Sequence, residues 1–225
     1  MARLRRVREP TAHRLFLLSP ASLRGTRARL VLNDGAGFDL ARALRTADGV
    51  PLGELFSFLS GLYFRGKLRY ASVFARPPGV LPGVLVITPG DGLVPPHTRV
   101  TVNVLHRWAE VRIDPEDERY TRPLLRDAGK LAAALAAEAP CEVVLLGSVA
   151  SPKYVDLLDD VLEHRLRFPA EFVGRGDMSR GGLLLRQADE GRELTYVPIA
   201  GAVRHGARPA RLAPRPRPAS GRARE

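Results

Sequence analysis

Short apolar segments alternate with stretches of helical periodicity along most of this chain, and this alternation constrains its fold more than any other feature. Apolar segments bounded by Gly, Pro or Ser are typical of buried strands in a parallel sheet. Five segments fit that description: Arg14–Ser19, Val84–Thr88, Glu142–Gly147, roughly residues 165–173, and Leu194–Ile199. Strands that alternate with helices indicate an α/β protein. We therefore predict a three-layer sandwich with a mostly parallel, Rossmann-like sheet.

Helical patterns fill the gaps between these segments. Residues 52–75 carry apolar side chains at close to 3.6-residue spacing, with a break or kink expected at Ser60-Gly61. Residues 120–138 give the strongest pattern, because they end in a run of Ala and Leu. Ser151 and Pro152 are typical of an N-cap and a first helical residue. We interpret the acidic residues of that third helix as a solvated face rather than as metal ligands.

Positive charge is concentrated at the two ends of the chain. The formal net charge is +11, but residues 1–14 hold five Arg and one Glu, and residues 204–225 hold seven Arg and one Glu. Only about +1 remains for residues 15–203. A length of 225 residues suits one core. We expect a basic N-terminal arm (1–13), a single α/β domain (14–203), and a disordered Arg/Pro-rich tail (204–225).

Two interpretations of the basic ends remain open. Only three Lys accompany 32 Arg, a bias that a GC-rich genome produces through codon usage alone. Alternatively, the ends bind nucleic acid electrostatically, in a manner that ignores base sequence. No apolar stretch approaches the ~20 residues needed to span a bilayer, and the run 15–18 is too short for a secretory signal. We therefore expect a cytoplasmic protein with no membrane partner.

Small and polar residues follow four of the predicted strands. In an open parallel sheet, ligands bind outside the carboxyl ends of the strands. Loops at that edge carry function in many α/β proteins, so we predict a ligand site there. The residues assigned to it are Ser19, Ser22, Thr88, Gly90, Gly92, Gly147 and Ser148, with Lys153 and Tyr154 one helical turn further on.

The fourth of these loops is rich in glycine and arginine. Its glycines leave room for close approach of a ligand, and guanidinium groups suit carboxylate or phosphate. We assign anion binding to Gly174, Arg175, Gly176, Ser179 and Arg180. The segment matches no Walker or dinucleotide fingerprint, so no cofactor is assigned.

Two structures are compatible with the residues that follow this loop. The favoured one is a helix from Asp177 to about Glu190 that stops at Gly191, because it would direct a positive dipole end at the ligand. The other is a strand over residues 183–188.

Asp91 and Asp177 are the candidate catalytic residues. Two carboxylates brought together by the fold suit acid–base chemistry, although Gly-Asp-Gly around Asp91 is also good turn chemistry. Ser148 lies in no Gly-x-Ser-x-Gly elbow, so binding a hydroxyl or phosphate suits it better than nucleophilic attack. The five histidines are scattered and Cys141 is the only cysteine, so no metal site is assigned.

Tyr63, Lys67 and Tyr70 recur at i, i+4 and i+7 and share a helical face. Core packing is the common role of such tyrosines. Basic residues interleave with them, however, and aromatic and basic side chains together stack on bases and neutralise phosphates. These three residues are therefore candidates for nucleic-acid binding.

The order of these motifs resembles that of an uncharacterised bacterial family of small Rossmann-like α/β domains. The matching stretches are residues 17–22, 63–70, 86–95, 146–148 with 153–154, and 168–182. The first loop lacks the Cys and Lys often found in that family, and Pro89-Gly90 replaces its usual Ala. Residues 88–96 are also similar to an accessory α/β domain of archaeal tRNA-guanine-modifying enzymes. That similarity implies nucleic acid or nucleobases as ligands and implies no reaction.

These features together predict a protein that binds a nucleotide, a nucleobase or another anionic ligand derived from nucleic acid at the carboxyl edge of its sheet. Processing of that ligand is an open question. The alternative is a non-catalytic module that binds nucleic acid or protein through its basic ends. The expected partners are accordingly an anionic small molecule or a nucleic acid.

Overall fold

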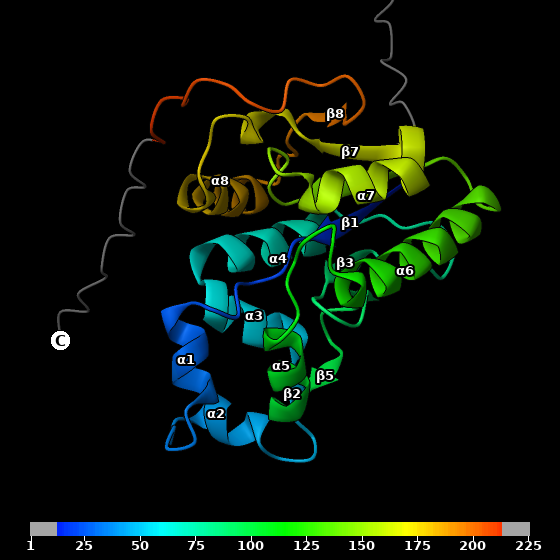
Figure 1. Ribbon diagram of the computed structural model, residues 1–225. Helices are drawn as coiled ribbons and strands as arrows, with labels where there is room; N and C mark the ends of the chain where they lie inside the picture. The colour runs from blue at the N-terminus through cyan, green and yellow to red at the C-terminus, as the bar shows by residue number, and fades with distance from the viewer. Residues whose placement is uncertain (1–12, 213–225) are drawn as a thin grey trace, which may run out of the picture.

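A six-stranded sheet lies between two layers of helices in the computed structural model, which describes residues 13–212 (Figure 1). The strand order is β4-β3-β1-β6-β7-β8. The bounds are β1 His13–Leu18, β3 Val84–Ile87, β4 Leu93–Val94, β6 Cys141–Leu146, β7 Leu166–Pro169 and β8 Tyr196–Pro198. The four inner strands are parallel, and β4 and β8 are antiparallel to their neighbours. The predicted α/β fold with a mostly parallel sheet is confirmed.

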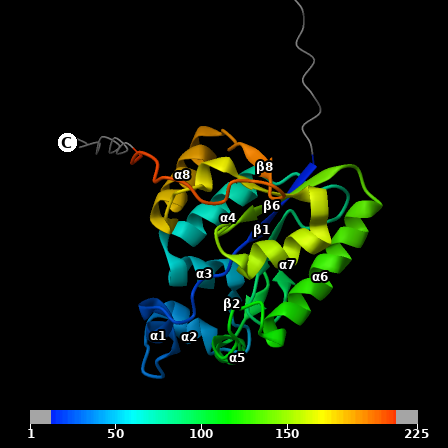
Figure 2. The ribbon, with the colours of Figure 1, turned by 45° about the horizontal axis from the view of Figure 1, so that its top comes forward.

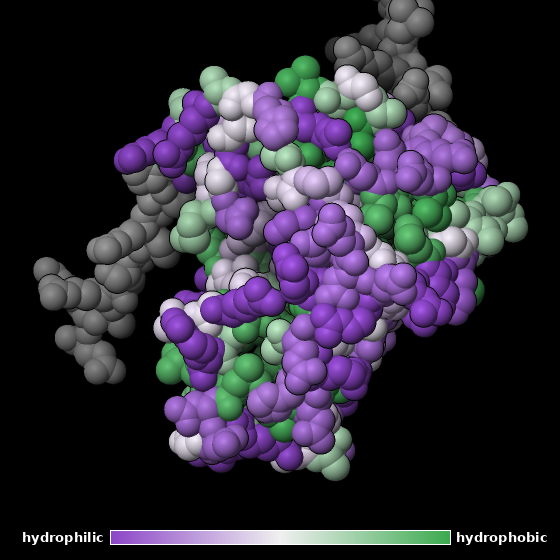
Figure 3. Space-filling view, in the orientation of Figure 1, coloured by the Kyte–Doolittle hydropathy of each residue, from purple (hydrophilic) through white to green (hydrophobic). Residues whose placement is uncertain are grey.

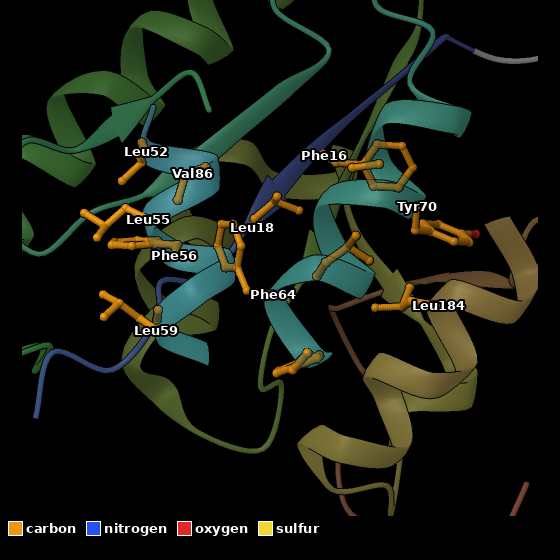
Figure 4. Close-up of a cluster of buried hydrophobic side chains, with 14 of the residues drawn as sticks. Phe16, Leu18, Leu52, Leu55, Phe56, Leu59, Phe64, Tyr70, Val86 and Leu184 are labelled. Carbon is orange, nitrogen blue, oxygen red and sulfur yellow. The ribbon is translucent and has the colours of Figure 1, made fainter. Parts of the chain in front are cut away.

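Side chains on β1 alternate between two cores, one on each face of the sheet. Phe16 and Leu18 belong to the core formed with α3 (Leu52–Ser60), α4 (Leu62–Phe74) and α8 (Asp177–Glu190) (Figure 4). Leu15 and Leu17 belong to the core formed with α6 (Glu118–Ala136) and α7 (Pro152–Leu162). Figure 2 shows α6 and α7 together on one side of the sheet and α4 and α8 on the other. Burial of both faces explains why the strands are continuous apolar runs.

The first three predicted strands agree with β1, β3 and β6 to within one residue at each end. The fourth is shorter than predicted, because β7 ends at Pro169 and a 3-10 turn (Ala170–Phe172) follows it. The fifth, β8, was wrongly expected to be parallel. The N–H of Ala170 donates to the carbonyl of Thr195, so the chain enters β8 beside the carboxyl end of β7 and runs back along it.

The predicted helices are confirmed. The break at residues 60–61 is real: Gly61 has φ +60° and separates α3 from α4. Ser151 caps α7 by accepting a hydrogen bond from the Lys153 N–H. The helical interpretation of the segment after the glycine-rich loop is correct, since α8 ends at Gly191 in the left-handed conformation. The N-cap of α8 is Gly176, so Asp177 is its first helical residue.

Several short elements were not predicted. They are α1 (Thr26–Leu32), α2 (Asp39–Leu44), α5 (Val102–Ala109), and the antiparallel pair β2 (Val50–Pro51) and β5 (Arg99–Val100). They lie together in the lower part of Figure 1, next to α3. Elements of one or two turns, or of two residues, carry too few side chains to establish a periodic pattern.

Residues 204–212 have no regular secondary structure but contact the domain. A Cβ on Gly174 would lie 2.1 Å from the Ala207 carbonyl oxygen, and Leu212 packs against the core that contains α8. Arg204 forms an ion pair with Asp156 of α7 at 3.1 Å. The rest of the basic ends, residues 1–12 and 213–225, lies outside the described residues. No helix within residues 13–212 has both the length and the apolar character needed to cross a membrane.

Candidate functional site

The loops that follow β1 and β6 leave the sheet in opposite directions. The chain after β1 enters the layer that contains α3 and α4, whereas the chain after β6 enters α7 on the other face. Since β1 and β6 are neighbours, this divergence opens a crevice at their carboxyl ends, between Ser19 and Ser148. Such a topological switch point is where open α/β sheets bind their ligands.

A cleft of about 530 Å³ occupies this crevice, a size that suits a small-molecule site. The elements that line it are the β1–α1 loop, the start of α4, the segment from the end of α5 toward α6, the start of α7 and the first residue of α8. Figure 3 shows that the face bearing α1, α5 and α7 is mainly hydrophilic. The cleft itself combines serine hydroxyls and charged groups with an apolar wall that includes Trp108 and Ile113.

A buried lysine lies beside the cleft. Lys67 of α4 is only 1% exposed, and its Nζ donates to the carbonyl oxygen and, at 2.8 Å, to the Oγ of Ser19. The same Nζ lies 4.5 Å from the centre of the Tyr63 ring and 4.9 Å from that of Phe64. No carboxylate within residues 13–212 is at ion-pair distance from it. Burial lowers the pKa of Lys67 to about 7, although the charge of Asp177 acts in the opposite direction.

Two buried donors that belong to cleft-lining side chains lack a hydrogen bond of good geometry among the described residues, although the Arg180 guanidinium lies close enough to the first of them to act as a weak hydrogen-bond partner. They are the hydroxyl of Tyr63 and the Nε1 of Trp108. A buried donor without a partner costs about 1–3 kcal/mol, so native proteins retain few of them. Burial raises the pKa of the Tyr63 hydroxyl, and it raises the pKa of Tyr154, also in the cleft, to about 12. Both hydroxyls therefore keep their protons at neutral pH and are able to donate.

Two basic side chains that line the same cleft form no ion pair or hydrogen bond with other described residues. Arg24 and Lys153 are exposed, and neither side chain forms an ion pair or hydrogen bond within the described part of the chain. Arg112, by contrast, pairs with Asp114 at 3.1 Å. Asp177 is the other carboxylate of the cleft, and it lies 3.6 Å from the guanidinium of Arg180. The cleft therefore offers two free positive charges to an incoming anion.

The structure brings together part of the site predicted from the sequence. The predicted residues that line the cleft are Ser19, Ser22, Tyr63, Ser148, Lys153, Tyr154 and Asp177. They come from four separate segments of the chain, as expected for loops that meet at one edge of a sheet.

The loop after β3 forms a tight turn and contributes little to the cleft. The Oγ1 of Thr88 donates to the Gly92 carbonyl and accepts from the Asp91 N–H. The Asp91 carboxylate accepts two contacts, at 2.8 and 3.1 Å, from Nη2 of Arg107. Asp91 does not line the cleft that holds Asp177, so the structure does not bring these two carboxylates together there. This geometry agrees with the interpretation of Gly90-Asp91-Gly92 as a turn.

The glycines of the predicted site serve close packing. A Cβ on Gly147 would lie 2.9 Å from the Cβ of Ser19, and one on Gly92 would lie 2.2 Å from the Asp127 carboxylate. Gly90 faces the Trp108 ring, with 3.2 Å from an added Cβ to the nearest ring atom. An added Cβ on Gly176 meets no atom within 4 Å.

The arginines of the glycine-rich loop are engaged inside the protein. Arg180 is buried, and its Nε and Nη2 donate to the carbonyl of Phe172. The Nε of Arg175 donates to the Glu171 carbonyl, and its Nη1 donates to Ser179. Neither guanidinium lines the cleft, so each would have to leave its internal partners to bind an anion. We therefore assign the anion to other residues.

The face of α4 that was expected to bind nucleic acid is buried inside the protein. Tyr63, Lys67 and Tyr70 are all buried, so the interpretation of this face as a platform for stacked bases is wrong. The reason is that α4 is covered by the sheet on one side and by α8 on another. The Tyr70 hydroxyl accepts a hydrogen bond from the Leu194 N–H and pairs with the Tyr196 hydroxyl at 2.5 Å.

Sequence reasoning missed three contributors to the cleft. Trp108 and Arg112 belong to a short helix and loop that no pattern identified. Arg24 lies two residues beyond the small-residue loop after β1 and could have been found by extending that loop. Within residues 13–212, no three His, Cys, Asp or Glu side chains are grouped as metal ligands would be.

Comparison of the chain with models of known protein families, with curated proteins and with solved structures found no match.

Proposed function

We propose that this protein binds a small anionic ligand of nucleotide size in the cleft between Ser19 and Ser148. The observation that carries the proposal is the presence of two exposed cations, Arg24 and Lys153, without internal partners among the described residues at a single cleft. Two unpaired cations at one cleft favour an occupant rich in acceptor oxygens. Phosphate and carboxylate groups meet that description.

The lining favours a nucleotide or nucleobase over phosphate alone. A volume of about 530 Å³ accommodates more than a single anion. The partly exposed side chains of Val111 and Ile113 offer an apolar wall, which suits a base or another flat ring. Arg24 and Lys153 would hold the phosphate, and the hydroxyls of Ser22 and Ser148 would supply further hydrogen bonds.

Thermal-shift titration tests this proposal. The ligands are nucleoside monophosphates, the matching nucleosides and inorganic phosphate, each applied to the wild type and to the double variant R24M/K153M. We expect saturable stabilisation by at least one monophosphate and at least a ~10-fold weaker apparent affinity in the double variant, since charge-assisted hydrogen bonds are worth about 1.5–3 kcal/mol. The matched control is R107M, which removes an exposed arginine that pairs with Asp91 outside the cleft.

Two results would overturn the proposal. One is the absence of any saturable shift with every monophosphate. The other is an equal shift in the wild type, R107M and R24M/K153M, which would locate the bound anion elsewhere.

The concentration of positive charge at the ends favours a second function, electrostatic binding of nucleic acid. A chain truncated to residues 13–212 separates the two functions. If the ends act this way, the full chain binds single-stranded DNA with a steep dependence on salt concentration and the truncated chain does not. Equal binding by the two chains would exclude residues 1–12 and 213–225 as the binding element.

A further inference from the structure

We propose that Ser19 and Lys67 form a catalytic dyad for acyl transfer, in which the Oγ of Ser19 is the nucleophile and the Nζ of Lys67 is its general base. This inference rests on the proposed function in one respect, because it assigns a reaction to the same cleft. It goes beyond ligand binding and names a carboxylic ester or thioester as the class of substrate.

The position of Ser19 is the first support. It is the residue directly after β1, the strand beside which the two loops diverge. Its side chain is only 5% exposed but belongs to the wall of the cleft. A serine held at the carboxyl end of a central strand presents its Oγ to a bound ligand from a rigid element.

The contact between the two side chains is the second support. Residues 19 and 67 are far apart in sequence, yet Nζ lies 2.8 Å from Oγ, within the reach that a nucleophile and its base require. The Ser19 carbonyl takes a second hydrogen bond from the same Nζ. These two contacts fix the orientation of the amine toward the serine.

The surroundings of the amine are the third support. A base must be neutral to accept a proton, and Lys67 is enclosed by protein with no carboxylate at ion-pair distance among the described residues. The Tyr63 and Phe64 rings favour the charged amine, so burial is what favours the neutral form. The charged groups that act on it from α8 are Asp177 and Arg180, which have opposite signs. With the pKa of Lys67 lowered to about 7, roughly half of the molecules carry a neutral amine at neutral pH.

A purely structural role explains this arrangement less well. Burial of an ammonium group whose hydrogen bonds, among residues 13–212, all go to one serine is costly, and methionine would fill a similar volume without that cost. Proton transfer by the amine accounts for a buried lysine at this position.

The reaction follows from these positions. As neutral Lys67 takes the proton from Ser19, the Oγ attacks the acyl carbon and a tetrahedral oxyanion forms. Its collapse breaks the bond to the leaving oxygen or sulfur, which receives the proton from Lys67. Water then attacks the acyl-serine while Lys67 accepts one of its protons, and the Oγ leaves with that proton. The products are a carboxylic acid and an alcohol or thiol, and the enzyme returns to its starting state.

The cleft holds other groups suited to this reaction. Arg24 and Lys153 would hold an anionic part of the substrate away from the reacting carbon.

Labelling with a fluorophosphonate, followed by peptide mass spectrometry, tests the dyad on the full chain. We expect the wild type to carry one adduct on Ser19, and S19A to carry none there. K67M should label at least ~100-fold more slowly, because general-base catalysis is worth 10²–10⁴-fold. S72A removes an exposed serine on α4 and is the matched control, expected to label at the wild-type rate.

A second measurement covers the case in which K67M does not fold. Labelling of the wild type should rise with pH along a curve whose midpoint is near 7, and K67R should lose that rise. An unlabelled Ser19 in folded wild type, or an adduct on Ser22 or Ser148 instead, would overturn the dyad, as would a wild-type labelling rate that does not change between pH 6 and 8.

The two proposals fail separately. Labelling is measured without any nucleotide, so it reports on Ser19 and Lys67 alone. Nucleotide binding is measured without the probe and depends on Arg24 and Lys153. If Ser19 is labelled but no nucleotide binds, the anion site is rejected and the dyad stands. If a nucleotide binds but Ser19 is not labelled, the dyad is rejected and the anion site stands.

Discussion

Gly66 of α4 and Gly181 of α8 face each other where the two helices cross, and neither position has room for a side chain. A Cβ on Gly66 would lie 2.7 Å from the carbonyl oxygen of Gly181, and a Cβ on Gly181 would lie 2.8 Å from that of Leu62. This close crossing brings the first residue of α8, Asp177, to the same cleft as Tyr63 at the start of α4. The glycine pair therefore sets the width of one side of the cleft.

The variants G181A and G182A should have opposite effects on stability. In G181A the new methyl group meets backbone atoms that cannot move aside, so we expect a loss of about 1–3 kcal/mol in the free energy of unfolding. At Gly182 the nearest atom is 3.7 Å away, on the Leu212 side chain, so alanine should raise helix stability by up to ~1 kcal/mol. Urea denaturation of both variants checks this. Equal effects would mean that the helices do not approach as closely as described.

The tyrosines Tyr63 and Tyr70 should also respond differently to loss of their hydroxyls. Y70F leaves the buried N–H of Leu194 without its acceptor, so we expect a loss of about 1–3 kcal/mol. Y63F removes a buried hydroxyl that lacks a hydrogen bond of good geometry, so stability should stay the same or rise by up to ~1 kcal/mol. A Y63F protein as unstable as Y70F would indicate that the Tyr63 hydroxyl is satisfied within the protein.

Lys67 should make stability depend on pH. Its pKa in the folded protein, about 7, is below the ordinary value of 10.5, so between these pH values the unfolded chain holds a proton that the folded protein lacks. The free energy of unfolding should therefore rise as pH increases through this window. The rise is on the order of 3 kcal/mol between pH 7 and 9.5, at about 1.4 kcal/mol per pH unit.

The variant K67M isolates this effect from all other titrating groups. The difference in unfolding free energy between wild type and K67M, measured by urea denaturation at several pH values, should change in favour of the wild type as pH rises. Below pH 7 the difference should become constant, because both states of Lys67 are then protonated. A difference that is constant from pH 6 to 9.5 would mean that Lys67 keeps its charge in the folded protein.

Asp91 should be dispensable for ligand binding. Its carboxylate is partly exposed and, within the described part of the chain, forms one ion pair, with Arg107; such pairs contribute about 0–1 kcal/mol. D91N should therefore bind nucleotide as the wild type does and lose less than ~1 kcal/mol of stability. D177N, which changes a carboxylate in the cleft itself, should alter nucleotide affinity. A larger effect of D91N than of D177N on nucleotide affinity would show that Asp91 contributes to the ligand site.

Several features of this protein were determined by local sequence alone. The strands β1, β3 and β6 are apolar over their whole length because both faces of the sheet are buried, so composition was sufficient to locate them. Ser151, Gly61 and Gly191 set helix boundaries through their own backbone and side-chain chemistry, which depends on nearest neighbours. The general geometry of parallel sheets predicted a ligand site at the carboxyl ends of four strands, and the cleft lies beside two of them, β1 and β6.

The chemistry of the cleft was decided by tertiary structure. Residue type predicted that Arg175 and Arg180 would bind an anion, but the fold directs both into internal contacts. The same residue types left both core packing and nucleic-acid binding open for the face that carries Lys67, and the crossing of α4 and α8 buries it beside Ser19. Whether a polar side chain meets solvent, a ligand or a distant part of its own chain depends on packing between elements far apart in sequence, and local sequence does not carry that information.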